Sequence, residues 1–413
     1  MKFDLTPPKG TKDIASDQAK KLWKIIETCK QVFESFGFEP LFTPAFEKFE
    51  ILSAKGGLGE AVKEEIYYFK DKAGRELGLR FDLTMPLARF VSANPQLPKP
   101  FKRYAIAPVW RYDNPQRLRY REFWQADIDI VGSSSILADV ECLACVCEVL
   151  NKLEIKNFKI RVNNRVLIEN LLKPYAGNKI KQVFRIIDKL DKIGEECVKK
   201  ELEEIDINSE KIMEIITMDI SEINQKGKEE IEKLFELASF YGIEKFLKID
   251  LSLVRGLDYY TSLVYEIYIE KENLSFGGGG RYDNLIEILS SRKIPATGIS
   301  LGITRLMEIL SNDFFKKQRK LKFLVTVLEN SMLKYYIEIC KAIRDQGFIC
   351  EFDVMERNLR KQLDYANSKA FDFVIFFGKK EKEKNVIKLR NMQTGEEKEI
   401  PFQDIRCLSK YIS

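Results

Sequence analysis

Two neighbouring segments of this 413-residue chain combine reactive side chains with bare backbone. Residues 255–261 read Arg-Gly-Leu-Asp-Tyr-Tyr-Thr, and residues 277–283 read Gly-Gly-Gly-Gly-Arg-Tyr-Asp. Residues 263–269 between them alternate and are rich in β-formers, which predicts a strand with both segments at strand ends or turns. A run of glycines lets the backbone approach a ligand closely, because no side chain intervenes. The combination suits a small polar ligand held beside a phosphate.

A predicted β-hairpin with a polar, basic loop carries a second group of candidate residues. Arg111 would stand on one strand. Gln125, Asp127 and Asp129 would stand on the other, and residues two apart share one face of a strand. On a buried face these polar groups need hydrogen-bond partners, which a ligand would supply. The alternative is a solvated hairpin with no ligand.

Two further groups lie where helices are predicted to begin. Asp82 and Thr84 are spaced to accept hydrogen bonds from an ammonium group, but on local chemistry alone a helix cap is the simpler explanation. Gly298 and Gly302 leave little side-chain bulk at a predicted strand-to-helix junction, and Arg305 begins the helix. Such a junction can hold a nucleotide with the arginine on a phosphate, or it can serve close packing alone.

The chain contains no histidine and eight cysteines. Without histidine it has no usual general base, no His-containing zinc pattern and no Ser-His or Cys-His pair. Cys142 and Cys145 have the spacing of a metal-binding pair, but no second such pair exists and their segment has helical periodicity. We interpret them as small thiols on a core helix. We expect no metal held by protein histidine or cysteine, and no disulfide framework.

The composition is that of an ordinary globular protein, with 45% hydrophobic and 32% charged residues. A net charge of +5 from 68 basic and 63 acidic residues permits nucleic-acid binding without demanding it. The sequence has no long uncharged apolar run and no apolar segment at its N-terminus. We therefore expect a cytoplasmic protein that does not enter a membrane.

The order of predicted elements indicates an α+β catalytic part with a mainly antiparallel sheet. Pro40 and Pro44 make the segment at 38–42 an edge or interface strand, after a helix that Gly37 ends. The lysine- and glutamate-rich stretch at about 166–246 has a helical period and is interpreted as a solvated insertion. The remaining predicted elements of this part are helices at 16–36, 84–93 and 138–153 and strands at 66–70, 77–82, 101–110 and 123–131.

Strands and helices alternate from residue 320 onward, which indicates a small α/β domain. The mixed-sign run at 379–384 is expected to form a solvated turn. The predicted domains are 1–320 and 321–413. The expected elements of the second are strands at 321–327, 348–352 and 371–377 and helices at 333–345 and 359–369.

These segments resemble those of the histidyl-tRNA synthetases, members of the class II aminoacyl-tRNA synthetases. The resemblance spans essentially the whole chain. It includes the Pro-Pro-Lys-Gly-Thr-Lys-Asp loop at 7–13, motif 1 near 36–44, motif 2 around Arg111 and motif 3 at 298–305. The segments at 255–261 and 277–283 resemble the two signature segments of the histidine-specific enzymes. The resemblance implies a class II catalytic sheet followed by an α/β anticodon-binding domain.

The implied reaction has two steps. L-Histidine attacks the α-phosphate of ATP to give histidyl-adenylate and pyrophosphate, and the histidyl group then passes to the 3′ end of tRNA(His). The implied partners are L-histidine, ATP with Mg²⁺, tRNA(His) and a second copy of the chain, since motif 1 usually forms a dimer interface. The resemblance implies these catalytic residues: Arg111 and Arg255 on the α-phosphate and Arg305 at the γ-phosphate end.

The resemblance also assigns the ligand-binding positions. In the implied histidine pocket Asp82, Thr84 and Gln125 hold the α-ammonium group, while Asp129 and Tyr260 read the imidazole. Asp82 and Asp129 stand where many bacterial relatives carry the longer glutamate. The full histidine-binding set is Asp82, Leu83, Thr84, Arg111, Gln125, Asp129, Arg255, Tyr259, Tyr260 and Tyr282. The ATP-binding set is Arg111, Arg119, Gly302 and Arg305, and the implied tRNA-binding positions are Gln116 and Arg117. In the C-terminal domain the sequence itself offers Arg357, Arg360 and Lys361 as basic candidates for tRNA contact.

Two alternatives compete with this interpretation. One is a catalytically silent relative, the histidine-binding regulatory subunit of ATP phosphoribosyltransferase. Such relatives tend to lose the signature arginines and the C-terminal domain, whereas Arg111, Arg255 and Arg305 are present here. The other is a class II synthetase specific for threonine, proline or glycine, which the imidazole-reading pair argues against.

Overall fold

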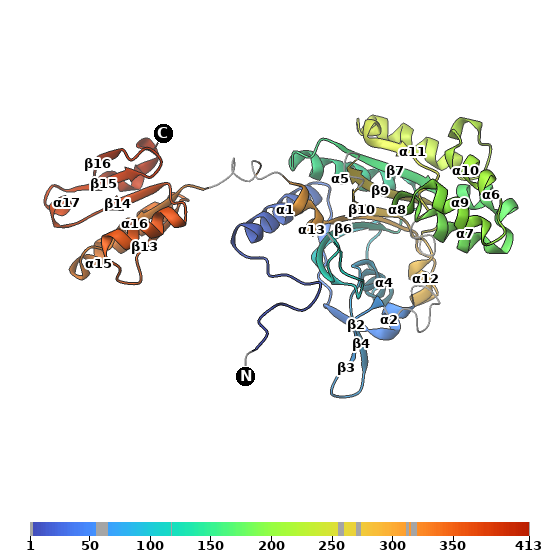
Figure 1. Cartoon of the computed structure of the whole chain (residues 1–413), viewed down its shortest axis with the longest axis horizontal. Coiled ribbons are helices and arrows are strands. Elements are labelled where there is room, and N and C mark those ends of the chain that lie inside the picture. Colours follow the sequence, from blue (N-terminus) through green and yellow to red (C-terminus); the bar gives the residue numbers. More distant parts are fainter. Residues whose placement is uncertain are drawn as a thin grey trace. The chain divides into compact units, whose positions relative to one another are not determined.

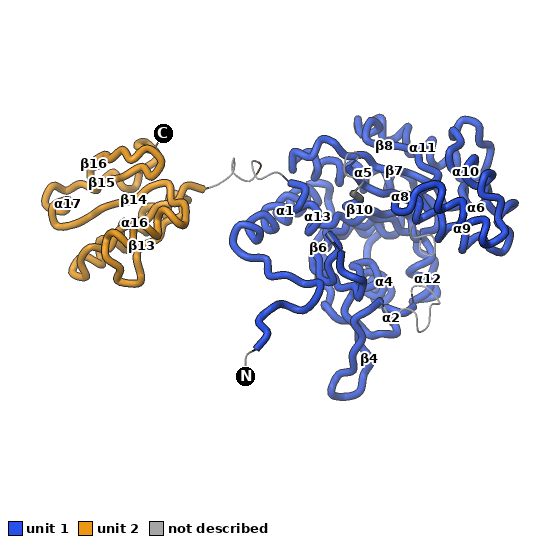
Figure 2. The backbone as a smooth tube through the Cα atoms, viewed as in Figure 1, with its two compact units in different colours: residues 1–311 blue, residues 312–413 orange. Residues whose placement is uncertain are grey.

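The chain folds into two compact units, residues 1–311 and 312–413 (Figure 2). The computed structural model describes residues 3–54, 65–116, 118–254, 260–269, 274–310, 314 and 320–412. The predicted domain boundary at 320/321 stays a prediction. No helix in these described ranges is long and apolar enough to cross a lipid bilayer.

Unit 1 is built on a mixed, mostly antiparallel sheet (Figure 1). Its described strands follow the order β1-β5-β6-β11-β10-β9-β7-β8, and only the outer pairs β1–β5 and β7–β8 are parallel. Its strands are β1 (Glu39–Pro40), β5 (Phe101–Trp110), β6 (Glu122–Val131), β7 (Phe158–Asn164), β8 (Leu247–Ile249), β9 (Leu263–Ile269), β10 (Leu274–Arg281) and β11 (Ala296–Gly302). A small side sheet holds β2 (Phe46–Lys48), β3 (Tyr68–Lys70) and β4 (Glu76–Leu79).

Helices cover this sheet because their apolar residues recur at helical spacing. In the first helix Leu22, Ile25, Cys29, Val32 and Phe33 are all buried, and Gly37 follows it with a φ of +77°. The helices around the sheet are α1 (Ser16–Ser35), α2 (Phe49–Ser53), α4 (Thr84–Ala93), α5 (Ile136–Lys152), α12 (Leu285–Ser290) and α13 (Ile303–Ile309).

The C-terminal end of the second signature segment anchors α5 to the sheet. The Arg281 side chain pairs with the buried Asp139 and donates to the carbonyls of Ser133 and Ser135 at 2.9 and 3.0 Å. Asp139 also accepts hydrogen bonds at 2.7 Å from Tyr265 and from Thr297. Arg281 therefore holds the fold rather than facing a ligand.

A run of helices separates β7 from β8, as the sequence predicts for residues 166–246 (Figure 1). Asn164 caps the first of them, since its side chain accepts from the backbone of Val166 and Leu167. The helices of this insertion are α6 (Arg165–Ala176), α7 (Ile180–Ile187), α8 (Leu190–Ile193), α9 (Glu195–Glu203), α10 (Ser209–Thr217) and α11 (Lys228–Phe240).

Unit 2 has a sheet with the strand order β13-β12-β14-β15-β16, and its core includes Phe323, Tyr336 and Ile375. The prediction of an α/β domain is confirmed, although the mixed-sign run at 379–384 forms a short helix rather than a turn. Its elements are β12 (Lys322–Val325), α15 (Leu333–Asp345), β13 (Ile349–Phe352), α16 (Leu359–Ser368), β14 (Phe373–Phe376), α17 (Lys379–Glu383), β15 (Val386–Asn391), β16 (Glu397–Pro401) and a 3₁₀ segment Phe402–Lys410.

Candidate active site

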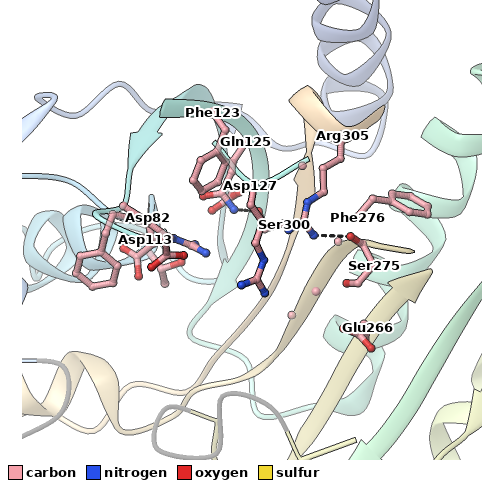
Figure 3. Close-up of a pocket in the computed structure, with 18 of the residues that line it drawn as sticks. Asp82, Asp113, Phe123, Gln125, Asp127, Glu266, Ser275, Phe276, Ser300 and Arg305 are labelled. Atoms are coloured by element: carbon pink, nitrogen blue, oxygen red, sulfur yellow. Dashed lines mark hydrogen bonds between the residues drawn. The ribbon is translucent and has the colours of Figure 1, made fainter. Parts of the chain in front are cut away.

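A cavity of about 820 Å³ opens over the polar faces of β6, β11 and β10. Figure 3 shows Gln125, Asp127 and Ser300 between Asp82 on one side and Arg305 on the other. A cavity of this size accommodates a nucleotide-sized ligand. Residues from the insertion also line it, so its wall is not made by the sheet alone.

The register of the sheet decides which β6 carboxylate reaches the cavity. Ala105 and Ala107 of β5 lie opposite Asp127 and Gln125 and leave room above them, and both polar residues line the cavity. Arg103 lies opposite Asp129, and its Nη2 is 2.8 Å from the Asp129 Oδ2. Asp129 is therefore engaged by Arg103 and is not among the residues that line the cavity.

On the other side of β6, strand β11 places small residues against the same polar row. Ser300 lies opposite Asp127, and its hydroxyl accepts a hydrogen bond from Gln125 Nε2 at 2.7 Å. Gln125 Oε1 and Asp127 Oδ1 are buried and have no hydrogen-bond partner in the described structure. Two unpaired acceptors in a cavity are suited to a ligand that carries N–H groups.

Three carboxylates, Asp82, Asp127 and Asp129, lie near two buried cations, Arg103 and Arg80. Burial raises the pKa of Asp127 to about 7, although Arg103 opposes the shift; the charge of Asp129 adds to it. Burial also raises the pKa of Asp129, against the effects of Arg103 and of a hydrogen bond from Tyr282. This excess of acid favours a cationic ligand.

Helix α4 begins at the edge of the cavity. Asp82 is buried, and its Oδ1 accepts a hydrogen bond from the Met85 backbone at 2.9 Å, so it supports the helix start as the capping alternative expected. Asp82 and Thr84 nevertheless both line the cavity. Leu83 is packed below, where its carbonyl accepts from Arg103 at 2.9 Å.

Arg111 and Arg305 are two of the arginines that line the cavity, and backbone carbonyls hold both of them. Arg111 donates from Nε to Phe81 at 3.1 Å, and its guanidinium lies 5.1 Å from the centre of the Phe123 ring. Arg305 donates to the carbonyls of Ser275 and Leu118. Both guanidinium groups are thus oriented before any ligand binds.

The glycine run lies inside a strand, which corrects the prediction that this segment sits at a strand end or turn. Gly277–Gly280 pair with β9 on one side and with β11 on the other. A Cβ on Gly280 would come within 2.8 Å of the Tyr260 ring, and one on Gly279 would meet the Gly298 carbonyl. The glycines therefore let two strands and the Tyr260 ring approach closely, while Gly277–Gly279 form one wall of the cavity.

Gly298 provides the space that the Asp129 side chain occupies. A Cβ at this position would lie 2.1 Å from Asp129 Oδ1 and 2.7 Å from the Ile128 carbonyl. We expect Gly298→Ala to lower the free energy of unfolding by about 1–3 kcal/mol, as overpacking does. Chemical denaturation measures this loss. Gly278→Ala is the matched control, because its nearest neighbour is 3.3 Å away, and equal losses in the two variants would contradict the expectation.

Comparison with known proteins agrees with this geometry. Residues 10–306 match the family model of histidyl-tRNA synthetase, and residues 322–407 match an anticodon binding domain. The chain belongs to the histidyl-tRNA synthetase family. It is an aminoacyl-tRNA synthetase with the activity of a histidine–tRNA ligase, and the antiparallel catalytic sheet and separate anticodon-binding unit are those the resemblance implied.

Individual relatives cover the chain from end to end. A histidine–tRNA ligase from Nanoarchaeum equitans is 40% identical over 99% of this chain and 100% of its own length, and one from Pyrobaculum islandicum is 37% identical over 96% of both. The crystal structure of histidyl-tRNA synthetase from Nostoc has a TM-score of 0.82 at 28% identity, covering 99% of this chain and all of its own. A Bacillus halodurans structure described as an ATP phosphoribosyltransferase regulatory subunit/histidyl-tRNA synthetase is 22% identical and shows the fold alone.

The synthetase structure brings most of the predicted ligand-binding residues together. The cavity is lined by Asp82, Thr84, Arg111, Arg119, Gln125, Tyr260, Gly302 and Arg305. Leu83, Asp129 and Tyr282 are buried beneath it and are not among its lining residues. The Tyr282 hydroxyl donates to Asp129, so these two residues support each other. Arg255, Tyr259 and Arg117 lie outside the described residues.

The predicted tRNA-binding residues fall in two places. Gln116 forms a bridge with Arg119 in the motif 2 loop, with backbone hydrogen bonds of 3.2 and 2.9 Å. Arg357, Arg360 and Lys361 belong to unit 2 and flank the start of α16. Arg357 is held by Asp353 at 2.5 Å, which leaves Arg360 and Lys361 as the two exposed cations.

The sequence did not reveal several cavity residues. Lys181 and Arg185 of α7 line the cavity, one helical turn apart, although this stretch was interpreted only as a solvated insertion. The sequence predicted Asp127 on the same polar face of β6 as Gln125, but contact with the imidazole was assigned to Asp129. One feature of the sequence could have favoured Asp127. Ala105 and Ala107 are small residues beside the large Arg103, so they show where strand β5 leaves space next to β6.

Proposed function

We propose that this histidine–tRNA ligase binds L-histidine over the acidic floor of the cavity, with Asp127 rather than Asp129 facing the imidazole. The observation that carries this assignment is that Asp127, whose Oδ1 is buried without a hydrogen-bond partner, lines the cavity, whereas Asp129 does not. Tyr260 lies near the same group: burial raises the pKa of its phenol, and the charges of Asp127, Asp129 and Asp82 add to the shift. A phenol O–H and a carboxylate together satisfy the acceptor and the donor of a neutral imidazole.

The α-ammonium group is placed at the other end of the acidic row. Asp82, Thr84 and the free Oε1 of Gln125 offer oxygen acceptors there. Arg111 then lies beside the substrate carboxylate, where the α-phosphate of ATP must approach. The glycine wall and Arg305 receive the rest of the nucleotide. Arg119, Arg255 and Tyr259 keep the ATP- and histidine-binding roles that the resemblance gives them.

In the first step a carboxylate oxygen of histidine forms a bond to the α-phosphorus, and the bond to the β-phosphate oxygen breaks with release of pyrophosphate. Arg111 is positioned to stabilise the negative charge that grows on the α-phosphate, and its geometry is fixed beforehand by Phe81 and Phe123. In the second step a terminal hydroxyl of tRNA(His) attacks the carbonyl carbon, and AMP leaves.

Mg²⁺ would accompany the nucleotide. The described residues include no group of three or more metal-ligating side chains that could hold a metal alone. Mg²⁺ commonly uses one or two carboxylates and completes its shell with phosphate oxygens and water. Glu266 lies on the cavity wall, so its carboxylate fits such a shared site, where the ion would neutralise phosphate charge.

A homodimer formed through motif 1 is also proposed, in a cytoplasmic enzyme. Strand β1 stands at one of the two edges of the sheet that the described strands form, and the nearby Phe42 and Phe46 are 82% and 52% exposed. Exposed aromatic residues beside an unpaired strand edge are typical of a contact between subunits. Sedimentation analysis should give twice the chain mass of 48.1 kDa, and a concentration-independent monomer would contradict this proposal.

Histidine-dependent ATP–pyrophosphate exchange by the purified protein tests the proposed chemistry, and esterification of tRNA(His) tests the second step. Histidine binding without exchange would favour the silent regulatory subunit. Exchange with threonine, proline or glycine in place of histidine would favour another class II specificity. Exchange that requires histidine alone is the expected result.

The raised pKa of Asp127 predicts how stability depends on pH. The folded pKa is about 7 and the usual value is 3.8, so the ligand-free folded state holds a proton that the unfolded chain releases. This group therefore favours folding at low pH, and its contribution is lost as the pH rises to about 7. We expect Asp127→Asn to gain stability relative to the natural protein between about pH 4 and pH 7. Denaturation at several pH values measures this difference, and a constant difference would contradict the assignment.

A further inference from the structure

The first residues of the helical insertion hold the segment that carries Tyr260. The backbone N–H of Arg165 donates to the Ser262 carbonyl at 2.8 Å. Its side-chain Nη1 donates to the Tyr260 carbonyl at 3.2 Å, while its Nε lies 3.5 Å from Glu169 Oε2. One arginine thus connects α6 to the backbone on both sides of Thr261.

A second connection comes from the far end of the insertion. Glu230 of α11 accepts hydrogen bonds from the Ser262 hydroxyl and from the Asn164 side chain, the latter at 2.5 Å. Asn164 and Ser262 are buried. Gly227, just before α11, permits this approach, because a Cβ there would lie 2.7 Å from Asn164 Oδ1. The two ends of the insertion therefore converge on one tripeptide, residues 260–262.

The Tyr260 ring is also held closely, because little room surrounds it. A Cβ on Gly280 would lie 2.8 Å from the ring, so the tyrosine is packed directly against the β10 backbone. The Thr261 backbone N–H donates to the Arg281 carbonyl at 2.7 Å on the sheet side. The sheet holds this tripeptide from one side and the insertion from the other.

We propose that Arg165 is a positioning residue for histidine recognition, through which the helical insertion fixes the backbone of Tyr260. This inference rests on the proposed role of Tyr260 in reading the imidazole. It gives the insertion a task in the first half-reaction, before tRNA is present. Arg165 lines the cavity, but its guanidinium is engaged by Tyr260 and Glu169, so we assign its effect to the tyrosine.

The test compares Arg165→Gln with the natural protein in ATP–pyrophosphate exchange. Losing a hydrogen bond from a charged donor should raise the KM for histidine roughly tenfold, while the KM for ATP and kcat change less than about twofold. Arg165→Lys should recover part of the loss, since it keeps a charged donor. Lys173→Gln, an exposed position on the same helix, is the control and should behave like the natural protein.

The double variant Arg165→Gln with Tyr260→Phe separates positioning from direct contact. If Arg165 acts through Tyr260, its substitution should add less than about twofold to the histidine KM of Tyr260→Phe. Glu230→Gln should raise the histidine KM in the same direction as Arg165→Gln. An unchanged KM for histidine in Arg165→Gln, or a full tenfold effect on top of Tyr260→Phe, would overturn the proposal.

The natural protein distinguishes failure of this inference from failure of the proposed function. Absent histidine-dependent exchange in the natural protein would refute the function itself. Normal exchange together with an insensitive Arg165 would refute only the positioning role. Thermal unfolding of each variant identifies any that lose activity through unfolding, and a folded Glu230→Gln then carries the test from the other end of the insertion.

Discussion

Arg111→Lys should reduce histidine-dependent ATP–pyrophosphate exchange by about 10²–10³-fold, mainly through kcat. The guanidinium uses Nε to hold the Phe81 carbonyl at 3.1 Å and lies over Phe123, so its terminal amino groups are available to the α-phosphate. A lysine has a single ammonium group and no planar fork, and it cannot hold the carbonyl and the phosphate in the same geometry.

Arg75→Lys is the matched control for this experiment. Arg75 is 77% exposed and pairs with Asp71 at 2.6 Å, and it is not among the cavity residues. Its replacement by lysine should leave exchange unchanged, because exposed ion pairs contribute little. Near-normal exchange by Arg111→Lys would remove Arg111 from the proposed mechanism.

Asp127→Asn should raise the KM for histidine by about 10²-fold, with a smaller change in the KM for ATP. The substitution preserves shape but removes the buried charge that we propose faces the imidazole, and losing one partner of a buried charged hydrogen bond commonly costs this much affinity or more. Histidine-dependent exchange at varied histidine concentration measures the effect.

Asp129→Asn provides the comparison that decides between the two carboxylates. Asp129 is paired with Arg103 at 2.8 Å, so its neutralisation leaves a buried arginine without its partner. We expect this variant to lose stability more than histidine affinity. The reverse pattern, with histidine affinity lost only in Asp129→Asn, would show that Asp129 rather than Asp127 contacts the imidazole.

Much of the fold could be predicted because local patterns and tertiary structure agree. The helix at 84–93 and the strands at 101–110 and 263–269 have the predicted bounds, since each has clear periodicity and clear end signals. β7 was not predicted because it lies directly against the insertion, and β15 and β16 were not predicted because charged residues interrupt their apolar pattern. The glycine run was predicted at a strand end or turn, and only the close approach of neighbouring strands explains why it pairs inside a strand here.

The site was harder to predict than the fold because it depends on contacts across strands. Sequence spacing places Gln125, Asp127 and Asp129 on one face but does not show which neighbour covers each of them. That information is in the register with β5 and β11, which pairs Asp129 with Arg103. The contribution of Arg165 likewise follows only from the return of the chain past α6.

The pairing of Ala105 and Ala107 with the acidic row has a consequence for how this enzyme could be redesigned. These methyl groups do not line the cavity; they pack with Leu83, whose neighbours Asp82 and Thr84 do line it. A larger side chain on β5 would therefore push against the start of α4 beside the cavity. Substituting the two alanines should alter histidine binding while every proposed ligand-binding residue stays the same.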